Sequence, residues 1–60
     1  MISIEDFVNA CAYRGIRFQI FSIEDGSLLY RGDLAHCDYA ELIFVQWRID
    51  GEGGLLTFDV

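Results

Sequence analysis

The residues whose types could do chemistry lie together in the short segment "AHCD". His36, Cys37 and Asp38 can each bind a metal, but a structural zinc site needs four ligands, usually from two spaced pairs. The other cysteine, Cys11, falls on the apolar face of a predicted helix. His36 and Cys37 also have the residue types of a base and a nucleophile, yet adjacent side chains point apart. We therefore expect no metal, no cofactor and no enzyme activity.

A second candidate, "DGEGG" at residues 50–54, combines carboxylates with glycines. Its spacing differs from that of a calcium loop or a phosphate-binding loop, so we interpret it as a hairpin turn. The segment "EDGS" at residues 24–27 has the same turn residues. The remaining elements must therefore be arranged around two hairpins.

The opening "MISIEDFVNACAYRG" predicts an amphipathic helix that begins at Ile4. Ser3 is a good N-cap, and Asp6 stands three residues later, as in a capping box. Gly15 has the residue type that ends helices in the left-handed conformation. Apolar residues at helical spacing predict one buried face, formed by Ile4, Phe7, Val8 and Cys11.

The first hairpin begins with a strand at residues 16–23. A two-residue loop would pair Ile20 with Arg31 and put a charge on the core face. A three-residue loop with a left-handed Gly26 pairs Ile20 with Tyr30 instead, so both faces stay consistent. We expect this second register.

The second hairpin follows an acidic, small-residue-rich connector at residues 32–41, which we expect to hold one helical turn. Residues 42–49 predict the longest strand. A two-residue loop within "DGEGG" then pairs Trp47 with Phe58 and places Trp47 in the core. One continuous apolar face is expected on this strand, made of Ile43, Val45, Trp47 and Ile49.

These elements predict a single α+β domain over residues 1–60, in which one N-terminal amphipathic helix packs on a four-stranded antiparallel sheet made of two hairpins. A chain this short buries only about 60% of the surface that its unfolded form exposes. Because 53% of the residues are hydrophobic, the apolar surplus favours self-association or a partner.

The charge is lopsided, with ten acids against four arginines and a net charge of −6. This field repels phosphate backbones, so we expect no direct nucleic-acid binding and favour a basic protein surface as the partner. If the second and third strands are antiparallel neighbours, both hairpin loops and the helix N-terminus lie at one end of the sheet. The predicted partner-binding site is the resulting acidic rim, made of Glu5, Asp6, Glu24, Asp25, Asp50 and Glu52.

The sheet face away from the helix also carries apolar residues in this arrangement. A contiguous apolar patch usually marks an interface, so we expect a homodimer through this face or through an edge strand. A monomer whose connector covers the patch is the alternative. The residues predicted for self-association are Phe21, Ile23, Leu29, Leu42 and Phe44.

The N-terminal residues lack the basic and apolar regions of a signal peptide, and no apolar run approaches the ~20 residues of a membrane span. We expect a cytoplasmic protein without membrane contact. In that compartment Cys11 and Cys37 should be reduced and buried rather than paired.

The hairpin "IEDGSLLYRGD" and the closing "DGEGGLLTFDV" resemble the "x-D-G-x-L-x-Y-x-G" and "G-x-L-x-I-x-V" patterns of very short acidic proteins encoded by phages and prophages. Some proteins of this type, including anti-CRISPR proteins, block host defence by occupying basic nucleic-acid-binding surfaces. The resemblance therefore implies an inhibitor of a host nucleic-acid-binding defence protein, acting in the host cytoplasm. It carries no functional residue over, because the shared patterns are those of turns and strands.

The sequence supports two hypotheses. The first is a non-enzymatic, anti-CRISPR-like inhibitor that uses the acidic rim against a basic protein surface. The second is a homo-oligomeric structural or accessory protein that associates through its apolar sheet face. Rising salt should weaken the first association and preserve or strengthen the second.

Overall fold

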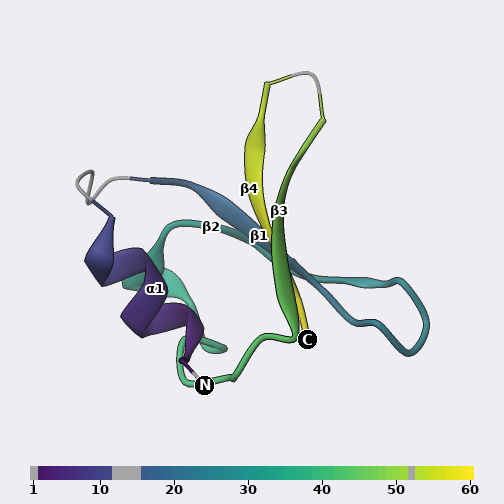
Figure 1. Cartoon of the computed structure of the whole chain (residues 1–60), viewed down its shortest axis with the longest axis horizontal. Helices are drawn as coiled ribbons and strands as arrows, with labels where there is room; N and C mark the ends of the chain where they lie inside the picture. Colours follow the sequence, from purple (N-terminus) through teal and green to yellow (C-terminus); the bar gives the residue numbers. More distant parts are fainter. Residues whose placement is uncertain (1, 12–15, 52) are drawn as a thin grey trace.

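The computed structural model describes residues 2–11, 16–51 and 53–60. Within them the chain forms a small α+β fold in which one α-helix accompanies a four-stranded mixed sheet (Figure 1). A single 3-10 turn, η1, lies in the connector between the second and third strands, as expected. The elements are α1 at Ile4–Ala10, β1 at Phe18–Phe21, β2 at Leu28–Gly32, η1 at Leu34–His36, β3 at Gln46–Asp50 and β4 at Leu55–Asp59.

Helix α1 begins where the sequence predicts. The Ser3 side chain accepts a hydrogen bond from the Asp6 backbone N–H at 3.1 Å, which confirms the N-cap. The helix ends at Ala10, because Cys11 already has an extended backbone with φ −71° and ψ 145°. The expected C-terminal glycine, Gly15, lies outside the described residues.

The first turn of α1 is fixed to the segment that precedes β3. The Ile4 N–H donates to the Leu42 carbonyl at 2.9 Å, and the Glu5 N–H donates to the Ala40 carbonyl at 2.8 Å. These bonds satisfy N–H groups that have no partner inside a helix. Residues 42–45, expected to be strand, instead form this irregular segment, and β3 begins only at Gln46.

Each hairpin contains a pair that the sequence predicts. Ile20 pairs with Tyr30 across the first hairpin, and Gly26 in its loop is left-handed with φ 72°. Trp47 pairs with Phe58 across the second hairpin. Turn chemistry and alternating faces thus predicted these pairs, but the first ladder shifts between Ile20 and Phe21, so Leu28 pairs with Phe21 and the expected pairing of Ser22 with Leu28 is wrong.

The order of the strands differs from the expected one. The sheet runs β2-β1-β4-β3, and the central pair, β1 and β4, is parallel, so the prediction of an antiparallel sheet is wrong for this contact. Phe18 lies beside Leu56, and Ile20 lies beside Phe58. The strands that supply the buried apolar residues thus occupy the centre, while β2 and β3, which carry the arginines of the sheet, form its edges.

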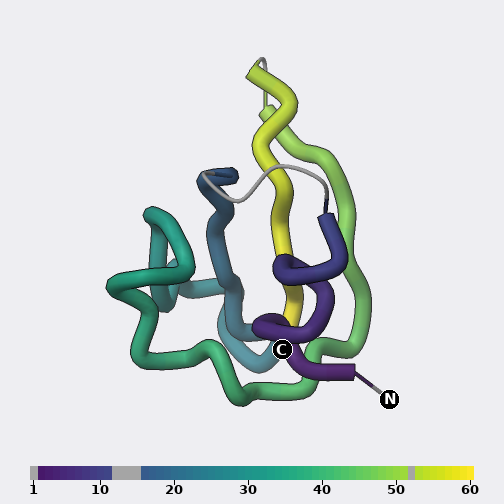
Figure 2. The backbone as a smooth tube through the Cα atoms, turned by 90° about the vertical axis from the view of Figure 1, so that its left-hand side faces the viewer, coloured from purple at the N-terminus to yellow at the C-terminus, as the bar shows by residue number. Residues whose placement is uncertain are grey.

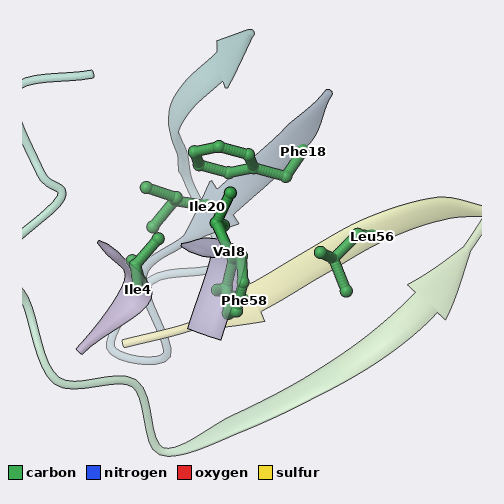
Figure 3. Close-up of a cluster of buried hydrophobic side chains, with 6 residues drawn as sticks. All are labelled: Ile4, Val8, Phe18, Ile20, Leu56 and Phe58. Carbon is green, nitrogen blue, oxygen red and sulfur yellow. The ribbon is translucent and has the colours of Figure 1, made fainter. Parts of the chain in front are cut away.

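The core lies between α1 and the two central strands. In Figure 2 the helix stands in front of β1 and β4, with β3 on one side and the connector on the other. Side chains from the helix and both central strands meet in Figure 3. The buried cluster consists of Ile4, Val8, Phe18, Ile20, Leu56 and Phe58, all at most 5% exposed.

Gly32, the last residue of β2, is buried beneath the ring of Tyr30. A Cβ atom on Gly32 would lie 2.6 Å from the Tyr30 Oη atom, closer than real Cβ atoms approach. The ring is held in place, because its hydroxyl donates to the Asp33 carbonyl at 2.6 Å and its centroid lies 5.8 Å from that of Phe18. A side chain at Gly32 therefore has no room.

We predict that Gly32→Ala lowers the free energy of unfolding by about 1–3 kcal/mol, because the added methyl group meets the Tyr30 ring and because residues with a side chain rarely adopt the φ of 156° at this position. Urea denaturation measures the change. Gly53→Ala is the matched control, since a Cβ atom there meets nothing within 4 Å. Equal effects of the two substitutions would show that the close approach of Tyr30 is unimportant.

Candidate interaction surface

The six acids of the expected rim do not share one end of the sheet. Because β1 and β4 are parallel, the β1-β2 loop lies where β4 finishes, and the β3-β4 loop lies where β4 begins (Figure 1). Glu24 and Asp25 are in the first loop, whereas Asp50 adjoins the second. Glu52 lies outside the described residues. The prediction of a single rim is therefore wrong.

A smaller set of acids does share the end where β1 and β4 finish. The start of α1 belongs to this end, because Ser3 bridges to Ile43 just before β3, and Gln46 pairs with Asp59 at the finish of β4. The hydrogen bonds of its first turn also bring the connector residue Glu41 to the same place. We call this exposed group the acidic end; it contains Glu5, Asp6, Glu24, Asp25 and Glu41.

The five residues predicted to form an apolar patch on the far face do not form one, so this prediction is also wrong. Phe44 packs into the core, with its ring centroid 4.9 Å from that of Phe58, and Leu29 is partly buried against the same core. Phe21 lies under the Arg48 guanidinium, 5.8 Å from ring centroid to Cζ. Only Ile23 and Leu42 are exposed, and the two do not form the predicted face.

Polar side chains occupy the middle of that far face. Gln19 donates from its amide nitrogen to the Thr57 hydroxyl at 2.9 Å, across the β1-β4 contact. Arg31 donates to the Gln19 amide oxygen at 2.9 Å. Thr57 is fully buried and Gln19 nearly so, and both are satisfied by these bonds. The two central strands are thus joined by apolar contacts on one face and by a polar network on the other.

Asp59 continues this network toward the β3 edge. It is 5% exposed and accepts hydrogen bonds from Gln46 at 2.7 Å and from the Arg48 Nε at 3.0 Å. The bonds from Arg48 hold the pKa of Asp59 below its usual 3.8, despite its burial. Arg48 also pairs with the exposed Asp50, and the two carboxylates raise the pKa of the guanidinium. This arginine is therefore fully engaged on the far face.

The apolar face predicted for the third strand is present but largely exposed, on the helix side of β3. Val45, Trp47 and Ile49 are 69%, 51% and 59% exposed, and we call them the β3 stripe. They lie on the same face as the core, because Trp47 pairs with the buried Phe58. The expectation that Trp47 is a core residue is wrong: one side of its ring meets Phe7, with centroids 5.3 Å apart, and about half of the residue is exposed.

The groups considered for metal or thiol chemistry stay apart. Cys11 and Cys37 are free and partly buried, and burial raises the pKa of the Cys37 thiol. The exposed His36 ring lies 2.9 Å from a carboxylate oxygen of Asp33. Within residues 2–11, 16–51 and 53–60, no three His, Cys, Asp or Glu side chains converge as metal ligands would.

No helix among the described residues has the length and apolar character needed to cross a membrane. Comparisons of the chain with protein-family models, with curated proteins and with solved structures give no match. The functional interpretation of this chain therefore depends on its surfaces.

We predict that Asp59→Asn lowers the free energy of unfolding by about 1–3 kcal/mol at neutral pH, because charge-assisted hydrogen bonds to Arg48 are lost. The depressed pKa of Asp59 means that this stabilisation is present above the unfolded carboxyl pKa of about 3.9 and disappears as pH falls through the folded value. Urea unfolding of both proteins over a series of pH values measures the difference.

Asp50→Asn is the control for this prediction, since it removes an exposed partner of the same Arg48 and should cost less. A difference between wild type and Asp59→Asn that stayed constant down to the lowest pH would contradict the role assigned to the Asp59 charge.

Proposed function

We propose that the protein is a non-enzymatic binding protein that docks on a basic protein surface through its acidic end. The observation that carries this proposal is the separation of charge over the described residues. Arg31 and Arg48 are hydrogen-bonded on the far face, and Arg17 precedes β1 at the opposite end of that strand. The exposed carboxylates of the acidic end thus have no described arginine among them.

Local structure positions three of the five carboxylates, those of Glu5, Asp6 and Asp25. Asp25 accepts a hydrogen bond from the Ser27 N–H at 2.9 Å, and this contact holds the pKa of Asp25 below its usual value. Glu5 and Asp6 lie in the first turn of α1, where negative charge also stabilises the helix. A fixed negative field of this kind accelerates encounter with a positively charged partner.

The class of partner that suits this surface is a nucleic-acid-binding protein, because its basic site is built to receive the closely spaced charges of phosphates. The resemblance of the two hairpins to short phage and prophage proteins supports the same choice. In this proposal the protein acts in the cytoplasm of the host, as an anti-CRISPR-like inhibitor that occupies the basic site of a defence protein.

Self-association is the second candidate, and the β3 stripe is the observation that favours it. Val45, which directly precedes β3, and Trp47 and Ile49 within this edge strand are apolar and exposed on one face. The surface differs from the one predicted on the far face, and it shares no residue with the acidic end. A homodimer and an acidic inhibitor are therefore compatible in one molecule.

We predict that the triple substitution Glu5→Gln, Glu24→Gln and Glu41→Gln slows association with the partner by about 10-fold or more, because the steering field is lost. The probes are purified CRISPR effector complexes and other basic nucleic-acid-binding defence proteins, immobilised on a sensor surface. Association rates are measured at low and high salt, and bound nucleic acid is tested for competition.

The matched control neutralises three described acids that are not members of the acidic end, Asp33→Asn, Asp38→Asn and Asp50→Asn, and so makes the same change in net charge. It should retain most of the association rate. Equal losses in both triple variants, or binding that ignores salt, would refute docking through the acidic end.

A further inference from the structure

The outer edge of β3 is open for pairing. In the described part of the chain β3 pairs with β4 alone, so one side of its backbone is available to another strand. Natural edge strands are usually protected by charged side chains or by a covering segment. Here the Arg48 side chain is directed toward β4, where its Nε lies 3.0 Å from the Asp59 Oδ2 atom. Its charge therefore does not cover the open edge of β3.

Exposed apolar residues also concentrate at this edge. Among residues 2–11, 16–51 and 53–60, eight large hydrophobic residues are exposed. Six of them belong to β3, to residues 42–45 before it, or to the N-terminal residues next to Ser3, which bridges to Ile43. These six are Ile2, Leu42, Ile43, Val45, Trp47 and Ile49. The other edge strand, β2, contributes only Leu28. Of the two sheet edges, β3 is therefore the one suited to a partner.

The sequence of β3 and the residue before it is nearly symmetric about its tryptophan. In "VQWRI", residues 45–49, an apolar residue, a polar residue, Trp47, a polar residue and an apolar residue follow one another. Two copies can pair antiparallel about a two-fold axis that is perpendicular to the sheet, and this arrangement keeps both stripes on the same face. Residues that pair directly must point to the same face, so the residue at the axis has to pair with its own copy.

One register confines the pairing to residues 45–49. With the axis at Trp47, Val45 lies beside Ile49 of the second copy, and Gln46 lies beside its Arg48. With the axis at Arg48, two guanidinium groups lie side by side. With the axis at Gln46, the pairing would extend to residues 43 and 44, which precede β3, and Phe44 there packs into the core. The register centred on Trp47 therefore fits residues 45–49 best, because its apolar residues face apolar ones and its polar residues face polar ones.

We propose that two copies of the chain pair through β3, antiparallel and centred on Trp47, and so join two four-stranded sheets into one. The paired stripes form one apolar surface between the two copies of α1. A stable dimer needs about 800 Å² from each partner, which is about a fifth of the 4173 Å² that one chain exposes. The acidic end takes no part in this contact.

Sedimentation equilibrium on the purified chain tests the proposal without any partner. Wild type is expected at twice the chain mass of 6.9 kDa. Val45→Glu and Ile49→Lys should each raise the dimer dissociation constant about 30-fold or more, because each puts a charge into the apolar contact. The double variant should restore the dimer, since each introduced glutamate then lies beside an introduced lysine of the other copy.

Two further measurements keep the result specific. Leu28→Glu, on the opposite edge, should leave the dimer intact, and circular dichroism should show every variant folded. Emission from Trp47, the single tryptophan, should shift to the blue as the wild-type concentration rises. A wild-type monomer at millimolar concentration, dissociation by Leu28→Glu, or a double variant no better than the single ones would each overturn the proposed pairing. None of these results bears on the acidic end, whose binding is measured separately.

Discussion

The parallel contact between β1 and β4 is the constraint on which the other features of the structure depend. On its helix side it sets Phe18 and Ile20 beside Leu56 and Phe58, and on its far side Gln19 bonds to Thr57 at 2.9 Å. Because the two hairpins meet through these strands, their loops point to opposite ends of the sheet. The same contact leaves β2 and β3 as edges, so it determines both where the acids lie and which strand is open.

The mismatch between helix and sheet explains the exposed apolar surface. Seven residues of α1 make a cylinder about 10 Å long and about 10 Å wide, whereas four strands spaced about 4.8 Å apart span more than 14 Å. The helix lies over the two central strands, and its Phe7 reaches only one side of Trp47. Part of the hydrophobic surplus seen in the composition is thus exposed on the helix face of β3.

Features set by near neighbours in the chain were predictable. The Ser3 cap, the left-handed Gly26 and the pairing of Ile20 with Tyr30 all follow from residues within a few positions or from the alternation of faces. Which strands of the two hairpins lie side by side was not predictable. The pairing inside each hairpin is the same whether the hairpins meet through an antiparallel or a parallel contact. Gln19 and Thr57, 38 residues apart, held the missing signal as polar residues inside the two most buried strands. The position of the acids was predicted only in part, because it depends on this contact between the two hairpins.

The central place of β4 also has a consequence for the order of folding. It is the last of the four strands along the chain, yet it supplies Leu56 and Phe58 to the core and holds the two hairpins together. During synthesis, α1 and the first hairpin leave the ribosome before β4 exists, so Ile4, Val8, Phe18 and Ile20 lack the part of the core that Leu56 and Phe58 supply. Contacts of such long sequence separation form slowly, because the entropy of closing the long loop must be lost first. The native core therefore closes only after translation of β4, and until then the nascent chain is the form most exposed to aggregation and proteolysis.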